Sequence, residues 1–118
     1  MIEEIELLAK LIEIPSQIGV NKEKEISFFL ADLLKKNGFS VEMFEFAKDR
    51  PNIIAKYRFK NSGPTIIFNG HMDTAPYYNE QNSWETDPGK AIIKNDKVYG
   101  RGSCDMKGGD CVCFGSNL

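Results

Sequence analysis

The chain has 118 residues, of which 42% are hydrophobic and 27% are charged, and its formal net charge is −2. This balance is typical of one globular domain with a modest core, and it offers neither a basic stripe for nucleic acid nor an acidic tail. No apolar run approaches the length of a transmembrane span, and Glu3 and Glu4 stand where a signal peptide would be basic. The sequence therefore predicts a cytoplasmic protein with no nucleic-acid or membrane partner.

Two amphipathic helices are predicted first, near residues 2–13 and 22–37. In the first, apolar residues recur at helical spacing and glutamates stand at the front, where the helix dipole favours them; Pro15 then ends the segment. In the second, basic residues occupy the last turn, and Gly38 follows as a natural C′ residue. Both apolar stripes are interpreted as core faces rather than as ligand sites.

Three strands are predicted next, near residues 39–46, 52–59 and 65–69. The first alternates apolar and polar residues until Phe44 and Phe46 slip out of phase, which indicates a bulge or the end of the strand. The third is a continuous apolar run, typical of a buried strand in a parallel sheet. Two helices followed by such strands predict an α/β fold.

The third predicted strand leads into His71, the only histidine, and Asp73 follows two residues later. Catalytic groups collect where such strands end, and a neutral imidazole is a common zinc ligand that a carboxylate usually orients. Further along, four glycines between Gly100 and Gly109 surround Asp105, which indicates positive φ angles or close backbone approach. His71 and Asp73 taken alone are also compatible with a hydrogen-bonded structural histidine.

Between these two segments the chain predicts a loop and a hairpin. Residues 75–89 form the loop, and Trp84 within it is interpreted as a cover for the core. Residues 91–94 and 97–99 predict a β-hairpin that turns at residues 95 and 96.

Two motifs together carry a family resemblance: Asn69-Gly70-His71-Met72-Asp73-Thr74, and Gly100-Arg101-Gly102-Ser103-Cys104-Asp105-Met106-Lys107-Gly108-Gly109. They resemble the amino-terminal signatures of the zinc amidohydrolases that include acetylornithine deacetylase, succinyl-diaminopimelate desuccinylase, the aminoacylases and glutamate carboxypeptidase. The resemblance covers residues 1–109 and implies the amino-terminal part of a three-layer α/β/α catalytic domain.

The resemblance also implies roles for individual residues. His71 is expected to ligate one Zn²⁺, Asp105 to bridge two, and Asp73 to act as a catalytic residue that holds His71. Co²⁺ is a conceivable substitute for the zinc. The resemblance further implies a cis peptide between Asp105 and Met106, and it places Tyr77 and Trp84 beside the metal cleft.

The function that the resemblance implies is hydrolysis of N-acyl amino acids or small peptides by metal-activated water, with a homodimer as one option for the intact parent. The family's general base, from a Glu-Glu pair, and its remaining zinc ligands have no counterpart in this sequence. Residues 110–118 are interpreted as a truncated or non-homologous tail, too short and too rich in glycine for the long apolar helix of the family. The isolated chain is therefore expected to be inactive, and its exact substrate stays open.

Two alternatives remain at this point. Cys104, Cys111 and Cys113 could join His71 in a Cys₃His structural zinc site, although their spacing lacks the usual C-x₂₋₄-C knuckle, and reduced thiols are the default in a cytosolic protein. The chain could also be a non-catalytic binding domain that uses the exposed sheet and its tyrosine-rich loop.

Overall fold

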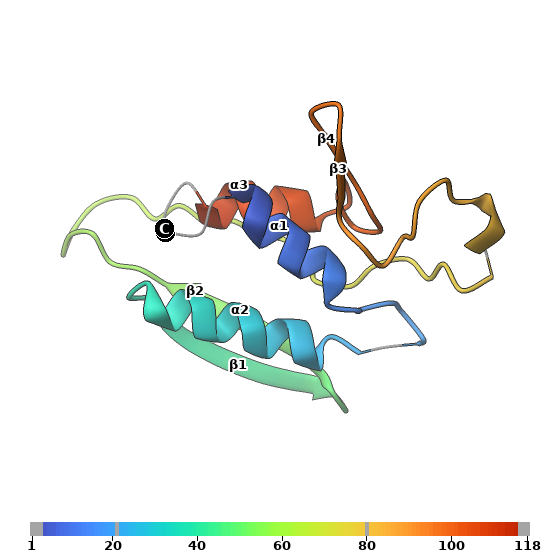
Figure 1. Ribbon diagram of the computed structural model, residues 1–118. Helices are drawn as coiled ribbons and strands as arrows, with labels where there is room; N and C mark the ends of the chain where they lie inside the picture. The colour runs from blue at the N-terminus through green and yellow to red at the C-terminus, as the bar shows by residue number, and fades with distance from the viewer. Residues whose placement is uncertain (1–3, 21, 80, 116–118) are drawn as a thin grey trace.

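The computed structural model describes residues 4–20, 22–79 and 81–115 (Figure 1). Helix α1 lies alongside α3, and α2 covers one face of the β1–β2 hairpin, while the β3–β4 hairpin projects from the side of the molecule opposite β1 and β2. The elements are α1 Glu4–Glu13, α2 Lys24–Lys36, β1 Ser40–Ala47, β2 Arg50–Lys56, the 3₁₀ turn η1 Gln81–Ser83, β3 Ile92–Lys94, β4 Lys97–Tyr99 and α3 Lys107–Gly115.

The two predicted amino-terminal helices are confirmed within the described residues. Helix α1 carries Glu4 and Glu6 in its first turn, and residues 2 and 3 lie outside the described part. Helix α2 ends in a Schellman motif, because Gly38 has φ 86° and the Phe39 N–H donates to Leu34 O at 3.0 Å. The glycine stop seen in the sequence therefore has the expected backbone geometry.

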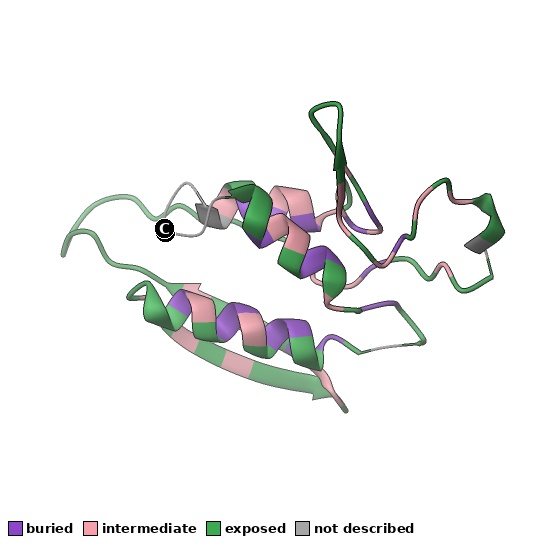
Figure 2. Cartoon of the chain, viewed as in Figure 1, coloured by how far each residue is buried: buried purple, intermediate pink, exposed green. Residues whose placement is uncertain are grey.

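The core lies where the three helices meet. Leu7 and Leu11 of α1 and Ile26 and Leu30 of α2 are buried together with Cys111 of α3. Figure 2 shows these buried positions along the helix faces that point inward. The apolar stripes are core faces, as predicted.

Strands β1 and β2 form an antiparallel hairpin that turns at Asp49, whose φ is 61°. The register shifts between Glu45 and Ala47, which confirms a bulge where the alternation of the sequence slips. Strand β2 ends at Lys56, three residues short of the predicted end at Phe59. The predicted hairpin of β3 and β4 is also confirmed.

The prediction of a buried strand at residues 65–69 is wrong for this chain. Residues 61–70 are all exposed, and Ile67 is 83% exposed in an extended segment that Figure 2 shows as continuous exposed chain after β2. A strand requires a hydrogen-bonded neighbour, and no described segment pairs with these residues. The run therefore has the composition of a buried strand without the partner that would bury it.

Residues 110–118 were expected to be too short and too rich in glycine for the long apolar helix of the resembled family, yet residues 110–115 belong to the helix α3, Lys107–Gly115; residues 116–118 lie outside the described part. Packing against α1 explains this result, since Cys111 is only 2% exposed and helical stability in proteins comes mainly from burial of one face. Gly108 is moreover required there, because a Cβ at that position would overlap with Ser103 O. The division of the chain at Gly109 into homologous and non-homologous parts stays a prediction.

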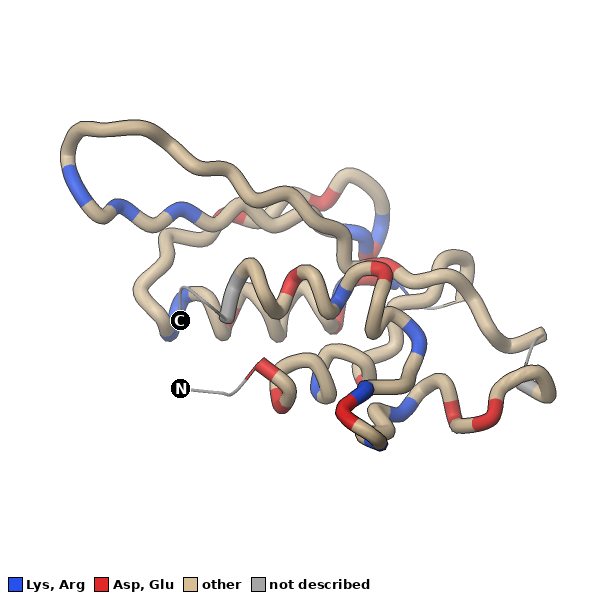
Figure 3. Tube along the Cα trace, turned by 90° about the horizontal axis from the view of Figure 1, so that it is seen from above, with Lys and Arg blue, Asp and Glu red and all other residues tan. Residues whose placement is uncertain are grey.

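The described residues contain no helix that is long and apolar enough to cross a membrane. Figure 3 shows basic and acidic residues interspersed along most of the trace. Three basic residues lie at the end of β2 and just after it: Lys56, Arg58 and Lys60.

Candidate metal centre

His71 lies between two carboxylates. Its Nε2 is 2.9 Å from Asp105 Oδ1, and its Nδ1 is 2.9 Å from Asp73 Oδ1 and 3.1 Å from Asp73 O. The two sequence segments that carry these residues therefore meet in space, as we expected. Their roles as zinc ligands and catalytic residue stay predictions.

Contacts with the chain that follows α1 hold the His71 segment, although the run before it is not part of a sheet. The Thr74 N–H donates to Ser16 O at 2.9 Å, and the Ile18 N–H donates to Thr74 O at 3.0 Å. The Ser16 hydroxyl donates to Met72 O at 2.7 Å, and Ser16 is only 1% exposed. These bonds flank Asp73 and fix the backbone that presents both His71 and Asp73.

The Asp105 segment is a tight glycine-rich loop. The Lys107 N–H donates to Gly102 O at 2.9 Å, which closes the loop around Asp105. Gly102 has φ 89°, and a Cβ there would lie 2.9 Å from Thr74 Cγ2, so only glycine combines this backbone with this close approach. The peptide between Asp105 and Met106 is cis, as the resemblance implied.

The electrostatics at His71 favour its charged form. Burial lowers the pKa of His71, but the hydrogen bond to Asp105 and the bond and charge of Asp73 outweigh it, and the net pKa is raised above its ordinary value of 6.5. An imidazolium can donate from both ring nitrogens, which suits carboxylates on both sides. The side chains of His71 and Asp105 are 46% and 86% exposed, so this pair opens to solvent.

The pair has part of the geometry of a zinc site. Two ligands of one tetrahedral zinc, each about 2.1 Å from the ion, lie about 3.4 Å apart. The observed 2.9 Å between His71 Nε2 and Asp105 Oδ1 is close to that separation. The described residues nevertheless contain no group of three or more His, Cys, Asp or Glu side chains placed to hold a metal. They supply two candidate ligands and an orienting carboxylate rather than a complete set.

The proposed Cys₃His site is not formed by the described residues, and that alternative is wrong for them. Cys104 is exposed, whereas Cys111 belongs to the buried core. Burial raises the pKa of the Cys111 thiol to about 12, which disfavours the thiolate that would bind a metal.

Two residues at this centre were missed by the sequence reasoning. Lys107 is 1% exposed, and burial lowers its pKa to about 8. Asp110 is 5% exposed, and burial raises its pKa to about 6 against the opposing charges of His71 and Lys107. Asp110 lies so close to Gly70 that a Cβ on Gly70 would overlap with Asp110 Oδ1.

Neither residue had a signal in the sequence, because residues 110–118 were interpreted as a tail and no helix was predicted to begin at Lys107. The structure shows that α3 begins at Lys107, where a lysine opposes the helix dipole, and this favours partners for its side chain outside α3.

The loop of residues 75–89 is tied to the chain just before Asp105. The guanidinium of Arg101 stacks on the Trp84 ring at 4.9 Å, and the Arg101 N–H donates to Pro88 O at 2.7 Å. The Tyr77 N–H donates to Gln17 Oε1 at 3.0 Å. Trp84 thus packs on a cation next to the glycine-rich loop, and a substrate contact by Tyr77 or Trp84 stays a prediction.

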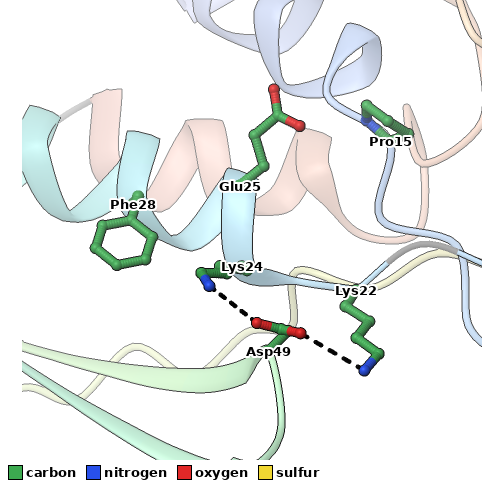
Figure 4. A pocket seen from close by; sticks show the side chains of 6 residues that line it. All are labelled: Pro15, Lys22, Lys24, Glu25, Phe28 and Asp49. Carbon is green, nitrogen blue, oxygen red and sulfur yellow. Dashed lines mark hydrogen bonds and ion pairs between the residues drawn. The ribbon is translucent and has the colours of Figure 1, made fainter.

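A surface depression of about 560 Å³ lies elsewhere, at the start of α2 (Figure 4). Figure 4 shows Asp49 between Lys24 and Lys22, with which it forms ion pairs of 2.9 Å and 3.7 Å. Lys22 and Lys24 thus pair with Asp49, and none of the lining residues belongs to the His71 centre. The depression is therefore not the candidate site.

Comparison with known proteins identifies relatives for both halves of the chain. Residues 67–114 match the family described as Peptidase family M20/M25/M40, and this match extends past Gly109 into α3. The chain is 39% identical over 108 residues to a succinyl-diaminopimelate desuccinylase of Wolbachia pipientis, an alignment that covers 92% of this chain and 26% of that protein. It is 35% identical over 122 residues to the N-formyl-4-amino-5-aminomethyl-2-methylpyrimidine deformylase of Bacillus subtilis. That alignment covers 98% of this chain and 28% of the deformylase.

A solved structure gives the same result. The M20 family metallo-carboxypeptidase Sso-CP2 from Sulfolobus solfataricus superposes with a TM-score of 0.81 at 27% identity, over 94% of this chain and 25% of that one. The chain thus spans about a quarter of the length of the curated relatives it matches. The sequence matches and the superposed fold indicate the same family, and the chain belongs to peptidase family M20/M25/M40.

Proposed function

We propose that the chain is the amino-terminal part of the three-layer α/β/α catalytic domain of a di-zinc amidohydrolase that acts on N-acyl amino acids or small peptides. The observation that carries this proposal is the convergence of His71 Nε2 and Asp105 Oδ1 at 2.9 Å from segments 34 positions apart. The desuccinylase and deformylase relatives support removal of an acyl group from nitrogen as the reaction class.

The residues have distinct tasks in this proposal. His71 and Asp105 would hold zinc, and Asp73 would accept a hydrogen bond from His71 Nδ1, which leaves Nε2 free to face the metal. Zinc would supply a bound water whose pKa is lowered to about 7, together with a charge that polarises the amide carbonyl. The Asp105 side chain is 86% exposed, so its carboxylate would be accessible to a second ion.

The described residues supply only part of this machinery. A catalytic zinc needs about three protein ligands and a water, whereas the described part of the chain places two ligands together. We therefore expect the purified chain to release no product from N-succinyl or N-acetyl amino acids with Zn²⁺ or Co²⁺ present. Turnover that disappears in His71→Ala would show instead that this chain holds a complete site.

Metal binding tests the proposal directly. Calorimetric titration with Zn²⁺ should show one weak site that is lost in His71→Ala and in Asp105→Asn. Asp96→Asn is the matched control, because Asp96 is exposed in the β3–β4 turn, where asparagine tolerates its φ of 57°. Zinc binding that is equal in all four proteins would refute the assignment.

A further inference from the structure

We propose that Lys107 is a positioning residue that sets the Asp105 carboxylate opposite His71 Nε2 by tying the glycine-rich loop to the carboxyl end of α1. The inference deepens the proposed function, because it concerns the same site. The contact itself is independent of metal. The Lys107 ammonium donates to Leu11 O at 2.6 Å and to Ile14 O at 2.9 Å.

These two carbonyls lack their usual backbone donors. Leu11 O would accept an intrahelical bond from residue 15, but that residue is Pro15, which has no N–H. Ile14 follows Glu13, the last residue of α1, so its carbonyl has no intrahelical donor, and the N–H of Ile18 donates to Thr74 O at 3.0 Å. Two carbonyls at the carboxyl end of α1 therefore lack intrahelical donors, and Lys107 donates to both, through a buried bond to Leu11 O and a partly buried bond to Ile14 O.

The placement of the ammonium also suits the helix dipoles. Lys107 is the first residue of α3, where a cation is unfavourable, but its Nζ lies at the carboxyl end of α1, where a cation is favourable. The side chain is only 1% exposed, so loss of its partners would leave a buried charge unpaired. The contact consequently restrains where the first residue of α3 can lie.

Asp105 is two residues before this anchor and inside the loop that the anchor closes. The Lys107 N–H donates to Gly102 O, so one residue holds both ends of the segment around Asp105. A Cβ on Gly102 would lie 3.0 Å from Lys107 Cδ and 2.9 Å from Thr74 Cγ2. The lysine stem and Thr74 thus lie against the same glycine. Because Thr74 follows Asp73, this packing places the His71–Asp73 segment next to the Asp105 loop.

Different contacts hold the other side of His71. Asp73 is flanked by the bonds of Ser16 to Met72 and Thr74, none of which involves Lys107. A positioning role for Lys107 therefore predicts an asymmetric effect: its loss should break the Nε2 contact to Asp105 and leave the Nδ1 contact to Asp73. A role in general stability predicts that both contacts survive in the folded fraction.

The experiment is ¹⁵N NMR of the imidazole at pH 5 in metal-free protein, where the single histidine gives one unambiguous set of signals and is protonated. Lys107→Met retains an apolar stem of similar length without the ammonium. We expect loss of the hydrogen-bond shift at Nε2, with the Nδ1 signal unchanged. Lys10→Met is the matched control, because Lys10 is exposed in the last turn of α1, and both signals should stay as in the parent chain.

Lys107→Gln serves as a second variant, because its shorter amide retains a donor that can reach one carbonyl at most, and it should show a smaller Nε2 change. Both signals unchanged in folded Lys107→Met would overturn the inference. Unfolding of both Lys107 variants would also overturn it, because the lysine would then act on the whole fold rather than on Asp105.

Zinc titration of the same variants separates the inference from the proposed function. If the site binds zinc, Lys107→Met should weaken the affinity by about 10-fold or more, as loss of a supporting contact to a ligand does. Failure of the unmodified chain to bind zinc would refute the proposed function, whereas the NMR result in metal-free protein would still decide the role of Lys107.

Discussion

Asp110 is a buried carboxylate that approaches the backbone of Gly70, next to His71. Burial raises its pKa from 3.8 to about 6, although the charges of His71 and Lys107 oppose the shift. A raised pKa means that folding favours the neutral acid, so the stabilising contribution is complete below pH 3.8 and is lost as the pH rises through about 6. At neutral pH this position costs the fold free energy.

Asp110→Asn should therefore raise the free energy of unfolding at pH 7 and flatten its decline between pH 4 and 6. A pKa of about 6 in place of 3.8 sets an upper limit on the order of 3 kcal/mol for this gain. Urea unfolding measured at several pH values checks this, with Asp96→Asn as the exposed control. The same decline in the variant as in the parent chain would contradict it.

At the scale of elements, α3 shows how tertiary contacts decide what a glycine does. Gly108 and Gly109 are adjacent helical residues, and replacing an exposed helical glycine by alanine usually stabilises by about 1 kcal/mol. A Cβ on Gly108 would overlap with Ser103 O, which is backbone and cannot rotate away. A Cβ on Gly109 would meet only Met106 Cε at 3.4 Å, an ordinary contact with a flexible side chain.

The two alanine variants should therefore have opposite effects. We expect Gly108→Ala to lower the free energy of unfolding by more than 1 kcal/mol, since backbone overlap must be relieved by moving α3, and Gly109→Ala to leave it equal or raise it by up to about 1 kcal/mol. Urea denaturation of both proteins under one condition makes the comparison. Equal changes in the two variants would show that α3 does not press against Ser103.

At the scale of the whole molecule, the exposed run before His71 is the largest departure from an ordinary surface. Ile66, Ile67 and Phe68 are 77%, 83% and 58% exposed, and the extended backbone has no paired strand among the described residues. An unpaired apolar edge is a template for another chain, and an identical copy can pair with it symmetrically. This run is also what favours the alternative reading of the chain as an interaction domain.

We expect the chain to self-associate through this run as its concentration rises. Sedimentation velocity should show an increasing average mass in the parent chain, and Ile67→Lys should reduce the increase, because a charge at the edge opposes pairing. Ile93→Lys is the control, since Ile93 is 58% exposed on a strand that already pairs within the β3–β4 hairpin. A chain that remains monomeric at every concentration would contradict this expectation.

Patterns that depend on near neighbours were predictable from the sequence. The structure contains four such features: the acidic first turn of α1, the end of α2 at Gly38, the bulge near Phe44 and Phe46, and the turn at Asn95 and Asp96. Each of these features reflects backbone or side-chain preferences within a few residues. The two motifs also predicted that His71, Asp73 and Asp105 share a site, and the structure brings these residues together; their roles stay predictions, which rest on a family resemblance rather than on local preference.

Features that depend on a distant partner were decided only by the tertiary structure. Residues 65–69 have the composition of a buried strand, but burial needs a neighbouring strand, which the described residues do not provide. Helix α3 forms against weak local propensity because α1 buries Cys111, and Asp110 enters the site with that helix. Lys107 is the clearest case: Pro15 removes a donor from one end of the chain, and a lysine 92 positions later replaces it, a pairing that only the folded chain brings within hydrogen-bond distance.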